Sequence, residues 1–147
     1  MGTLRKTLGV ATIMAAIGTA GVLTAPAASA SAAPCGKQAR ACVSLGANAA
    51  WLMRNGAVTY GSVPITSGRP GYLTPPGTFT VTYKDIDHYS QAFNGPMPYS
   101  VFFTRSGIAF HEGSLTVKSH GCIHLSHEAA KMFYNNLAPG DVVQVVA

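Results

Sequence analysis

Runs of charge are missing from this chain of 147 residues, and acidic residues are scarce: five Asp and Glu stand against ten Lys and Arg. The basic residues are scattered along the sequence, so the clustered cationic surface that nucleic-acid binding requires is not expected. Beyond the N-terminal segment there is no internal repeat and no low-complexity stretch. These absences favour a single small domain that is only mildly attracted to anionic polymers.

One segment is long and apolar, and it has the organisation of a secretory signal peptide covering residues 1–30. Arg5 and Lys6 precede an apolar run over residues 8–23, and Ala-Ser-Ala at 28–30 fits the small-x-small cleavage pattern, although cleavage two or three residues later fits as well. An uncleaved membrane helix is the alternative, but a run of roughly 16 residues is short of the ~20 that cross a bilayer. We therefore expect a secreted or cell-wall protein with no stable membrane association after cleavage. Removing the two basic residues leaves eight basic and five acidic residues, a net charge of +3.

Cysteine is scarce as well, and its three copies are unevenly placed. Cys35 and Cys42 are separated by six residues, and in an oxidising compartment a local disulfide is their expected state. Such a small loop would stabilise the fold by ~2 kcal/mol and tie down the lead-in, residues 31–48, which we predict to be loop-rich. Cys122 has no local partner, so it is either buried, bonded to another chain or chemically reactive.

The first half of the remaining chain is predicted to be β structure. Asn55-Gly56 joins two apolar runs and is the strongest short signal for a hairpin. Gly and Pro are dense in residues 68–77, which indicates an ordered loop. Alternation with β-branched and aromatic residues predicts a strand over 78–84, and residues 85–98 are expected to form a long irregular connection.

The second half adds further β structure and one helix. Residues 99–111 are predicted to form a hairpin that turns at Ser106-Gly107 and ends at His111. A serine N-cap and apolar spacing predict a helix over 126–137, and residues 141–146 have the pattern of a final strand. The predicted fold is therefore mainly β, a sandwich or half-barrel with one packed α-helix in a single domain.

The segment Ser-His-Gly-Cys-Ile-His at 119–124 sets Cys122 in a polar, turn-prone frame. A lone cysteine is commonly a small buried hydrophobe, but these flanks argue against a purely structural role. A zinc site is the second interpretation, because His120, Cys122 and His124 would share one face of an extended strand and His111 could complete the ligand set. Side chains two residues apart on a strand are ~6.5–7 Å apart, whereas tetrahedral ligand atoms approach to within about 4 Å of each other. No second ligand cluster is present, so neither a metal nor another cofactor is expected.

A nucleophile is the third interpretation, and the residues favour it. A thiol attacks a carbonyl carbon well once a nearby base accepts its proton, and His111 can approach Cys122 if the intervening segment folds back. The amides of His120, Gly121 and Cys122 lie in a turn that could stabilise an oxyanion. No acidic residue is placed to orient His111, so the backbone carbonyl of Glu112 is the better candidate for that role.

The stretch FHEGSLTVKSHGCIHL, residues 110–125, resembles the catalytic signature of the YkuD-type L,D-transpeptidases. In that signature a histidine after a strand is followed by a variable loop and Ser/Thr-His-Gly-Cys. Similarity extends upstream through GRPGYLTPPGTFTVTYK and MPYSVFF and downstream through LAPGDVVQVV, and it covers residues 49–147. The resemblance implies a YkuD-like β-sandwich or half-barrel, with this range as its catalytic domain.

Carried over to the matching positions, the resemblance implies a set of catalytic roles. Cys122 is the nucleophile, His111 is the base that activates it, and the backbone of Glu112 orients His111. The amides of His120, Gly121 and Cys122 form the oxyanion hole. The resemblance also implies three substrate-binding positions. Tyr99 lies in a segment that lines the site, Ser119 shapes the site, and His124 follows the cysteine by two residues.

The implied reaction is the formation of 3→3 cross-links in peptidoglycan, a step in cell-wall synthesis and cell shape. The cysteine would attack the third residue of a stem tetrapeptide, release D-alanine, and pass the acyl group to a side-chain amine of a neighbouring stem. The partners would be peptidoglycan stem peptides, and carbapenems would acylate the thiol. Two alternatives stay open beside the zinc protein: an L,D-carboxypeptidase, in which water resolves the same acyl-enzyme, and a wall-binding module without catalysis.

The sequence departs from the family pattern at two places. The family usually has Arg or Asn two residues after the cysteine, where this chain has His124. Histidine binds a carboxylate as a cation only when protonated, so donor binding is expected to be weaker or pH-dependent. The loop between His111 and Cys122 is also short, which predicts a more open cleft. His88 and His127 have no matched role in the family pattern.

Overall fold

The computed structural model describes residues 32–147. The predicted signal peptide and its cleavage site at residue 30 lie outside these described residues. Among residues 32–147 no helix is both long enough and apolar enough to span a membrane.

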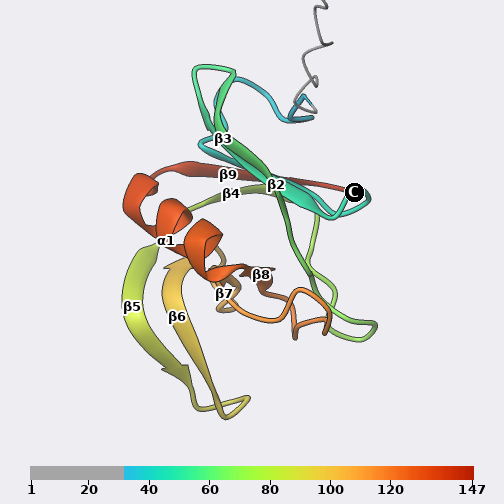
Figure 1. Ribbon diagram of the computed structural model, residues 1–147, viewed down its shortest axis with the longest axis vertical. Helices are drawn as coiled ribbons and strands as arrows, with labels where there is room; N and C mark the ends of the chain where they lie inside the picture. The colour runs from blue at the N-terminus through green and yellow to red at the C-terminus, as the bar shows by residue number, and fades with distance from the viewer. Residues whose placement is uncertain (1–31) are drawn as a thin grey trace, which may run out of the picture.

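Two sheets and one helix make up the described part of the chain (Figure 1). The first sheet has the strand order β3-β2-β1-β9-β4 and the second β5-β6-β7-β8. The strands of the first sheet are β1 (Ala41–Ser44), β2 (Ala49–Arg54), β3 (Ala57–Pro64), β4 (Gly77–Thr80) and β9 (Val142–Val146). Those of the second are β5 (Tyr83–Ser90), β6 (Gly95–Phe102), β7 (Ala109–Glu112) and β8 (Ile123–Leu125), and the helix is α1 (His127–Asn136). The prediction of a mainly-β single domain with one packed helix is confirmed.

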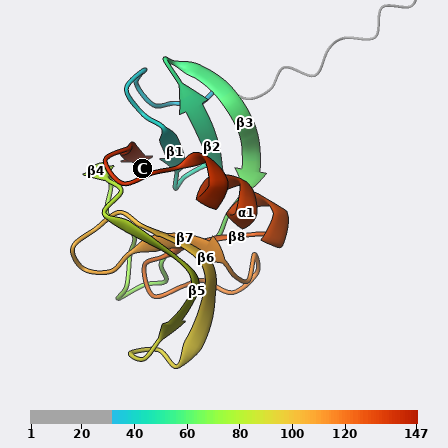
Figure 2. The same ribbon diagram turned by 90° about the vertical axis from the view of Figure 1, so that its left-hand side faces the viewer.

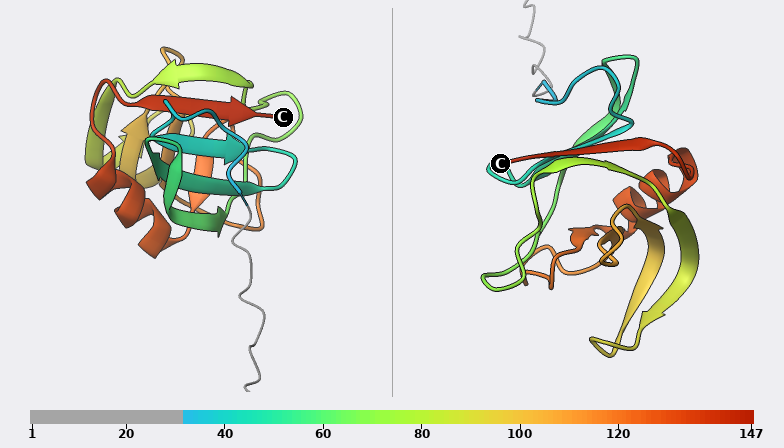
Figure 3. Two further views of the ribbon diagram at one scale, coloured as in Figure 1. Left: turned by 90° about the horizontal axis from the view of Figure 1, so that it is seen from above. Right: turned by 180° about the vertical axis from the view of Figure 1, so that it is seen from behind.

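The hydrophobic core lies between the two sheets, which face each other in Figure 2. Seen from above, the five-stranded sheet lies across the second sheet and α1 runs along one side (Figure 3). The helix buries Ala129, Ala130 and Phe133. The Phe133 ring contacts Phe110 of β7 at 5.0 Å and Tyr60 of β3 at 6.5 Å between centroids. One helical side chain thus packs against both sheets, which explains why a single helix suffices to close that side of the core.

Local signals for turns and caps are confirmed. Asn55 and Gly56, between β2 and β3, both have positive φ, 51° and 83°, as a two-residue hairpin turn with the strands' own twist requires. The Ser126 side chain accepts a hydrogen bond from the Ala129 amide and caps α1. The hairpin predicted over 99–111 is formed by β6 and β7, which carries His111 to the second sheet.

The lead-in is loop-rich outside residues 41–44, as the sequence pattern indicated, but it also contains a strand that the pattern did not predict. Its residues 41–44 form β1, a fully buried strand that pairs antiparallel with β2 and parallel with β9. A run of four small and apolar residues is too short to show periodicity, and its parallel partner lies about a hundred residues later in the chain, where no local pattern can reveal it.

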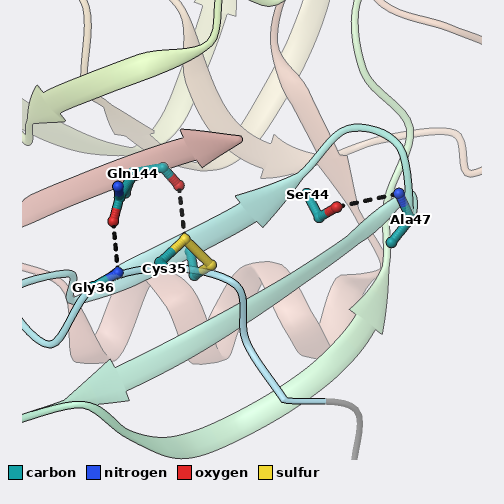
Figure 4. The surroundings of a disulfide bond; sticks show 6 residues. Cys35, Gly36, Ser44, Ala47 and Gln144 are labelled. Carbon is teal, nitrogen blue, oxygen red and sulfur yellow. Dashed lines mark hydrogen bonds between the residues drawn. A yellow bond between two sulfur atoms is a disulfide. The ribbon is translucent and has the colours of Figure 1, made fainter. Parts of the chain in front are cut away.

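A disulfide joins Cys35 to Cys42, with the two Cα atoms 5.7 Å apart (Figure 4). The neighbouring Gly36 amide donates to the Gln144 side-chain carbonyl at 2.9 Å, and Cys35 Sγ lies 3.5 Å from the Gln144 backbone oxygen. Since Gln144 belongs to β9, the disulfide holds the segment before β1 against the opposite end of the chain.

The strand predicted over 78–84 is divided between the two sheets. β4 ends at Thr80 and pairs with β9, whereas β5 begins at Tyr83 and pairs with β6, so the chain crosses from one sheet to the other at Val81 and Thr82. Continuous alternation cannot show such a crossing, because both strands keep the same period of two.

The connection predicted to be irregular over 85–98 is instead a hairpin of β5 and β6 with its tip at residues 91–94. Pro96 and Pro98 argued against a strand there. They are accommodated because β7 pairs with β6 only at Val101 and Phe102, which leaves an unpaired edge along the rest of β6. In Figures 1 and 3 this hairpin extends furthest from the five-stranded sheet.

Candidate active site

A cavity of about 620 Å³ opens on the second sheet. The β5–β6 hairpin, the loop before β4, the β6–β7 turn and the segment around Cys122 form its walls. Its lining includes Cys122 and four histidines, His88, His111, His120 and His124, but no Lys, Arg, Asp or Glu. The chemistry of the cavity therefore depends on a thiol and imidazoles, without any permanently charged side chain in its wall.

Cys122 follows a tight turn that Ser119 builds. The buried Ser119 hydroxyl donates to the Cys122 carbonyl oxygen at 2.6 Å and accepts from the Gly121 amide at 3.0 Å. Gly121 has φ of 119°, a conformation that favours glycine. Ser119 therefore shapes the site, as the resemblance implied, but both of its hydrogen bonds are used within the turn rather than offered to a substrate.

The Cys122 thiol is half-buried beside Met97, Phe102 and Ala109. Burial raises the pKa of the Cys122 thiol, and a hydrogen bond from the Ala109 backbone partly opposes that shift. The thiol donates to the Gly107 carbonyl oxygen at 3.9 Å. A thiol in these surroundings is protonated at neutral pH, so it needs a base to become a nucleophile.

His111 has the features of that base. It lies in β7 with only 6% of its surface exposed, and its Nδ1 donates to the Glu112 backbone carbonyl at 2.6 Å. A carbonyl oxygen only accepts, so Nε2 of the neutral ring is left as the proton acceptor. Burial lowers the pKa of His111 to about 4, partly opposed by the bond to Glu112, which keeps the ring neutral at physiological pH.

His111 and Cys122 line the same cavity, but within residues 32–147 no hydrogen bond joins the thiol to the imidazole. Catalytic hydrogen bonds often tighten only when substrate is bound. To give its proton to His111, the thiol would have to leave its contact with the Gly107 carbonyl.

The oxyanion hole differs from the expectation at one position. The Gly121 amide is bound to the Ser119 hydroxyl at 3.0 Å and is not free to receive a substrate oxygen. The amides of His120 and Cys122 are left as the two candidate donors. Gly121 contributes through its backbone conformation instead.

The His120 ring lies at the mouth of the cavity and connects three segments. It stacks on Phe93 at the tip of the hairpin, with 4.1 Å between centroids and 15° between planes. Its Nε2 is 2.9 Å from an Arg69 guanidinium nitrogen, which makes the ring the acceptor, and Tyr72 contacts its face edge-on at 4.9 Å. His120 thus fixes the hairpin tip beside the segment that carries the thiol.

His124 packs edge-on against His111, with 4.8 Å between ring centroids. Its Nδ1 donates to the Ser114 carbonyl at 3.0 Å and lies 3.1 Å from the Thr66 hydroxyl. Burial lowers the pKa of His124, so the ring is neutral at physiological pH. His124 lines the cavity and buttresses the base, but it offers no cation for a substrate carboxylate under these conditions.

The histidines do not converge on Cys122 as a metal site would demand. His120 is directed to Phe93 and Arg69, whereas His124 is directed to His111 and Ser114. Over residues 32–147 no group of three or more His, Cys, Asp or Glu side chains is arranged to hold one ion. The strand-face geometry behind the zinc interpretation does not form, because β8 begins only at Ile123.

Tyr99 does not line the cavity. Its φ is 58°, and its ring packs against His127 and Tyr134 of α1, at 5.5 and 5.9 Å between centroids. The left-handed backbone conformation interrupts the alternation of β6 and turns the side chain to the helix. The sequence alternation alone could not show this reversal.

The contribution of the β5–β6 hairpin to the cavity wall was not predicted from the sequence. Tyr83, His88, Tyr89 and Phe93 all line the cavity, although residues 85–98, which include the last three, were expected to be irregular. Their aromatic density was the available signal. His127, which also had no matched role, forms a surface pair with the Glu112 carboxylate at 2.9 Å, away from the cavity.

Comparisons with known proteins agree with this architecture. The family model described as the L,D-transpeptidase catalytic domain, YkuD, matches residues 38–145. Probable L,D-transpeptidase 3 of Mycobacterium tuberculosis is 33% identical over 104 residues, with 58% of this chain and 38% of that protein covered. An L,D-transpeptidase from Stackebrandtia nassauensis has a TM-score of 0.69 at 28% identity, covering 73% of this chain and 54% of that one.

A further solved structure, the L,D-transpeptidase LdtMt1 in complex with imipenem, has a TM-score of 0.64 at 27% identity and covers 71% of this chain and 56% of its own. This chain therefore spans between 38% and 56% of the length of these relatives. Since the family model matches nearly all of the described residues, the chain belongs to the family of L,D-transpeptidase catalytic domains.

Proposed function

We propose that the chain is an exported L,D-transpeptidase that forms 3→3 cross-links between peptidoglycan stems through an acyl-enzyme on Cys122. The observation that carries the proposal is the hydrogen bond of His111 to the Glu112 carbonyl, from which its tautomer follows. Its Nδ1 is held by the Glu112 carbonyl at 2.6 Å, which leaves Nε2 as a proton acceptor in the cavity that also exposes the only unpaired thiol of the described chain.

In the first half-reaction the thiol proton passes to Nε2 of His111 as sulfur attacks the carbonyl of the third stem residue. The amides of His120 and Cys122 donate to the developing oxyanion. The C–N bond then breaks, and His111 gives its proton to the departing amine of D-alanine. Because thiol and imidazole are both neutral beforehand, the reaction begins with proton transfer rather than from a stored thiolate–imidazolium pair.

In the second half-reaction an amine from a neighbouring stem attacks the thioester. The C–S bond breaks, the thiol regains a proton, and an amide links the third residues of two stems. The walls of the cavity suit a peptide without requiring a charged anchor, since its lining is aromatic, apolar and imidazole-rich. The complex of a similar protein with imipenem supports acylation of this thiol by carbapenems as well.

Export and a place in the cell wall are part of the proposal. The disulfide between Cys35 and Cys42 supports it, because structural disulfides persist in oxidising compartments outside the cytosol. The signal-like segment over residues 1–30 points the same way.

The experiment is product analysis by mass spectrometry after incubating the purified protein with a disaccharide-tetrapeptide, with Cys122→Ala beside it. Dimers that have lost one D-alanine, absent with the variant, are the expected result. Tripeptide without dimer would replace transpeptidation by L,D-carboxypeptidase activity. No product and no mass increase with a carbapenem would overturn acyl transfer on Cys122 and leave wall binding without catalysis.

A further inference from the structure

A second imidazole, which has a carboxylate partner, lines the same cavity as Cys122 and His111. His88, on β5, has its Nδ1 3.0 Å from the Asp85 carboxylate, three residues earlier on the same strand. A carboxylate only accepts, so the neutral ring carries its proton on Nδ1 and leaves Nε2 as an acceptor. His88 lines the cavity, whereas Asp85 does not.

The placement of His88 relative to the thiol follows from shared neighbours. Its ring contacts Phe102 edge-on, 4.9 Å between centroids, and its residue is the cross-strand partner of Met97. Cys122 packs against the cluster formed by Met97, Phe102 and Ala109. His88 and His111 line the same cavity as this thiol.

Transfer of the acyl group to an amine requires a second base besides His111. An acceptor amine arrives as an ammonium ion and must lose one proton before its lone pair can attack the thioester. The amine loses a second proton after attack, and His111 passes that one to the departing thiolate. In transfer to an amine, the ammonium loses two protons and the thiolate takes back one, so a second base must accept the other. In hydrolysis, the attacking water loses one proton, which His111 alone can pass to the thiolate.

The cavity is built to favour the first of these deprotonations. Its lining contains no Asp or Glu that would stabilise an ammonium ion, and loss of solvation lowers the pKa of an amine. The Asp85 carboxylate, in turn, stabilises the imidazolium that forms when His88 accepts the proton. We propose that His88, oriented by Asp85, is the catalytic base that deprotonates the acceptor ammonium in the second half-reaction. This inference rests on the proposed function and adds a residue to it.

The test separates the two half-reactions in one set of measurements. The His88→Gln variant is compared with wild type for acylation by a carbapenem, followed by intact mass, and for the ratio of amine transfer to hydrolysis with the disaccharide-tetrapeptide donor. We expect acylation to change less than about twofold and the transfer-to-hydrolysis ratio to fall on the order of 10²-fold, the lower range for loss of an acid–base group. Asp85→Asn should lower the ratio by roughly 10-fold, because it removes the partner of the base rather than the base itself.

The chain offers a matched control. His127 pairs with the Glu112 carboxylate at 2.9 Å in the same Nδ1 geometry but does not line the cavity, so His127→Gln should leave the ratio unchanged. Replacing an alkylamine acceptor by hydroxylamine, which is largely unprotonated near neutral pH, should restore most of the transfer that His88→Gln loses. This acceptor comparison can also be made with Asp85→Asn if His88→Gln does not fold.

Four results would overturn the inference. Transfer and hydrolysis that fall in equal proportion, or a loss that hydroxylamine does not relieve, would show that His88 only holds the hairpin in place. Absence of acylation in wild type would overturn the proposed function itself and this inference with it. Normal acylation with an unchanged ratio in His88→Gln would overturn the inference alone.

Discussion

The two sheets of this protein contact the same core but differ in what they expose. In the five-stranded sheet, β1 is fully buried and the disulfide secures the segment before it to β9. The second sheet carries the cavity, the thiol and the four imidazoles. The large hydrophobic residues exposed around the cavity, Tyr72, Leu73, Tyr83, Tyr89 and Phe93, belong to the hairpin and to the loop before β4. We therefore expect changes in the first sheet to alter stability, and changes in the second sheet to alter the proposed activity.

The largest effect on activity without an effect on the fold is expected at Cys122. Replacing it by alanine removes the nucleophile but leaves the turn made by Ser119 and Gly121, so acylation should be abolished and the fold retained. Intact-mass analysis with a carbapenem and far-UV circular dichroism measure the two properties. Unchanged turnover in this variant would contradict the assigned mechanism.

The next largest effect is expected at His111. His111→Ala removes the proton acceptor and should slow acylation by ~10²–10⁴-fold, the usual size of a general-base contribution. Single-turnover acylation rates measure this directly. His120→Ala is the control, because its ring contacts Phe93 and Arg69 rather than the thiol. A large loss in His120→Ala combined with none in His111→Ala would show that the base is assigned wrongly.

The buried base also links activity to stability. The folded pKa of His111, about 4, is below its unfolded value of 6.5, so the unfolded chain binds more protons as the pH falls. Stability should be unaffected above pH 6.5 and should decline between 6.5 and 4, by about 3 kcal/mol in total from this residue. Denaturant unfolding across this range, with His111→Gln beside wild type, measures the slope. The burial of His124 lowers its pKa and acts in the same direction, so the variant should keep part of the decline. An equal slope in both proteins would show that His111 is not the source.

The smallest effect is expected in the scaffold sheet. Replacing Cys35 and Cys42 together by alanine should lower the free energy of unfolding by ~2 kcal/mol, the usual size for a small disulfide loop. The rate of acylation should stay the same because the disulfide joins the segment before β1 to β1 and neither cysteine lines the cavity. Thermal unfolding and thiol titration check this together. Three titratable thiols in the unreduced wild type would contradict the disulfide.

Short sequence motifs were sufficient to predict the features that depend only on adjacent residues. Asn55-Gly56 predicted its turn, Ser126 its helix cap, and the segment around Cys122 its turn, because each depends on the conformational preferences of two to four adjacent residues. The expectation that the Glu112 carbonyl orients His111 agrees with the observed bond for the same reason, since the two residues are adjacent.

Features that depend on distant partners were not predictable. The assignment of β1 to the centre of a sheet requires β9, and the direction of Tyr99 requires α1. The β5–β6 hairpin looked irregular because its prolines are tolerated only on an edge that the rest of the sheet leaves unpaired.

The sequence by itself determined the candidate reacting groups of this protein, the mainly-β fold class and the turns that present the thiol, because these follow from residue types and short-range backbone preference. Only the tertiary structure decided the protonation of those groups and their neighbours. The low pKa of His111 arises from burial between segments far apart in the chain, and His88, paired with Asp85, lines the same cavity as the thiol only because the hairpin packs beside it. Burial and long-range packing are properties of the folded chain, and no short stretch of sequence contains them.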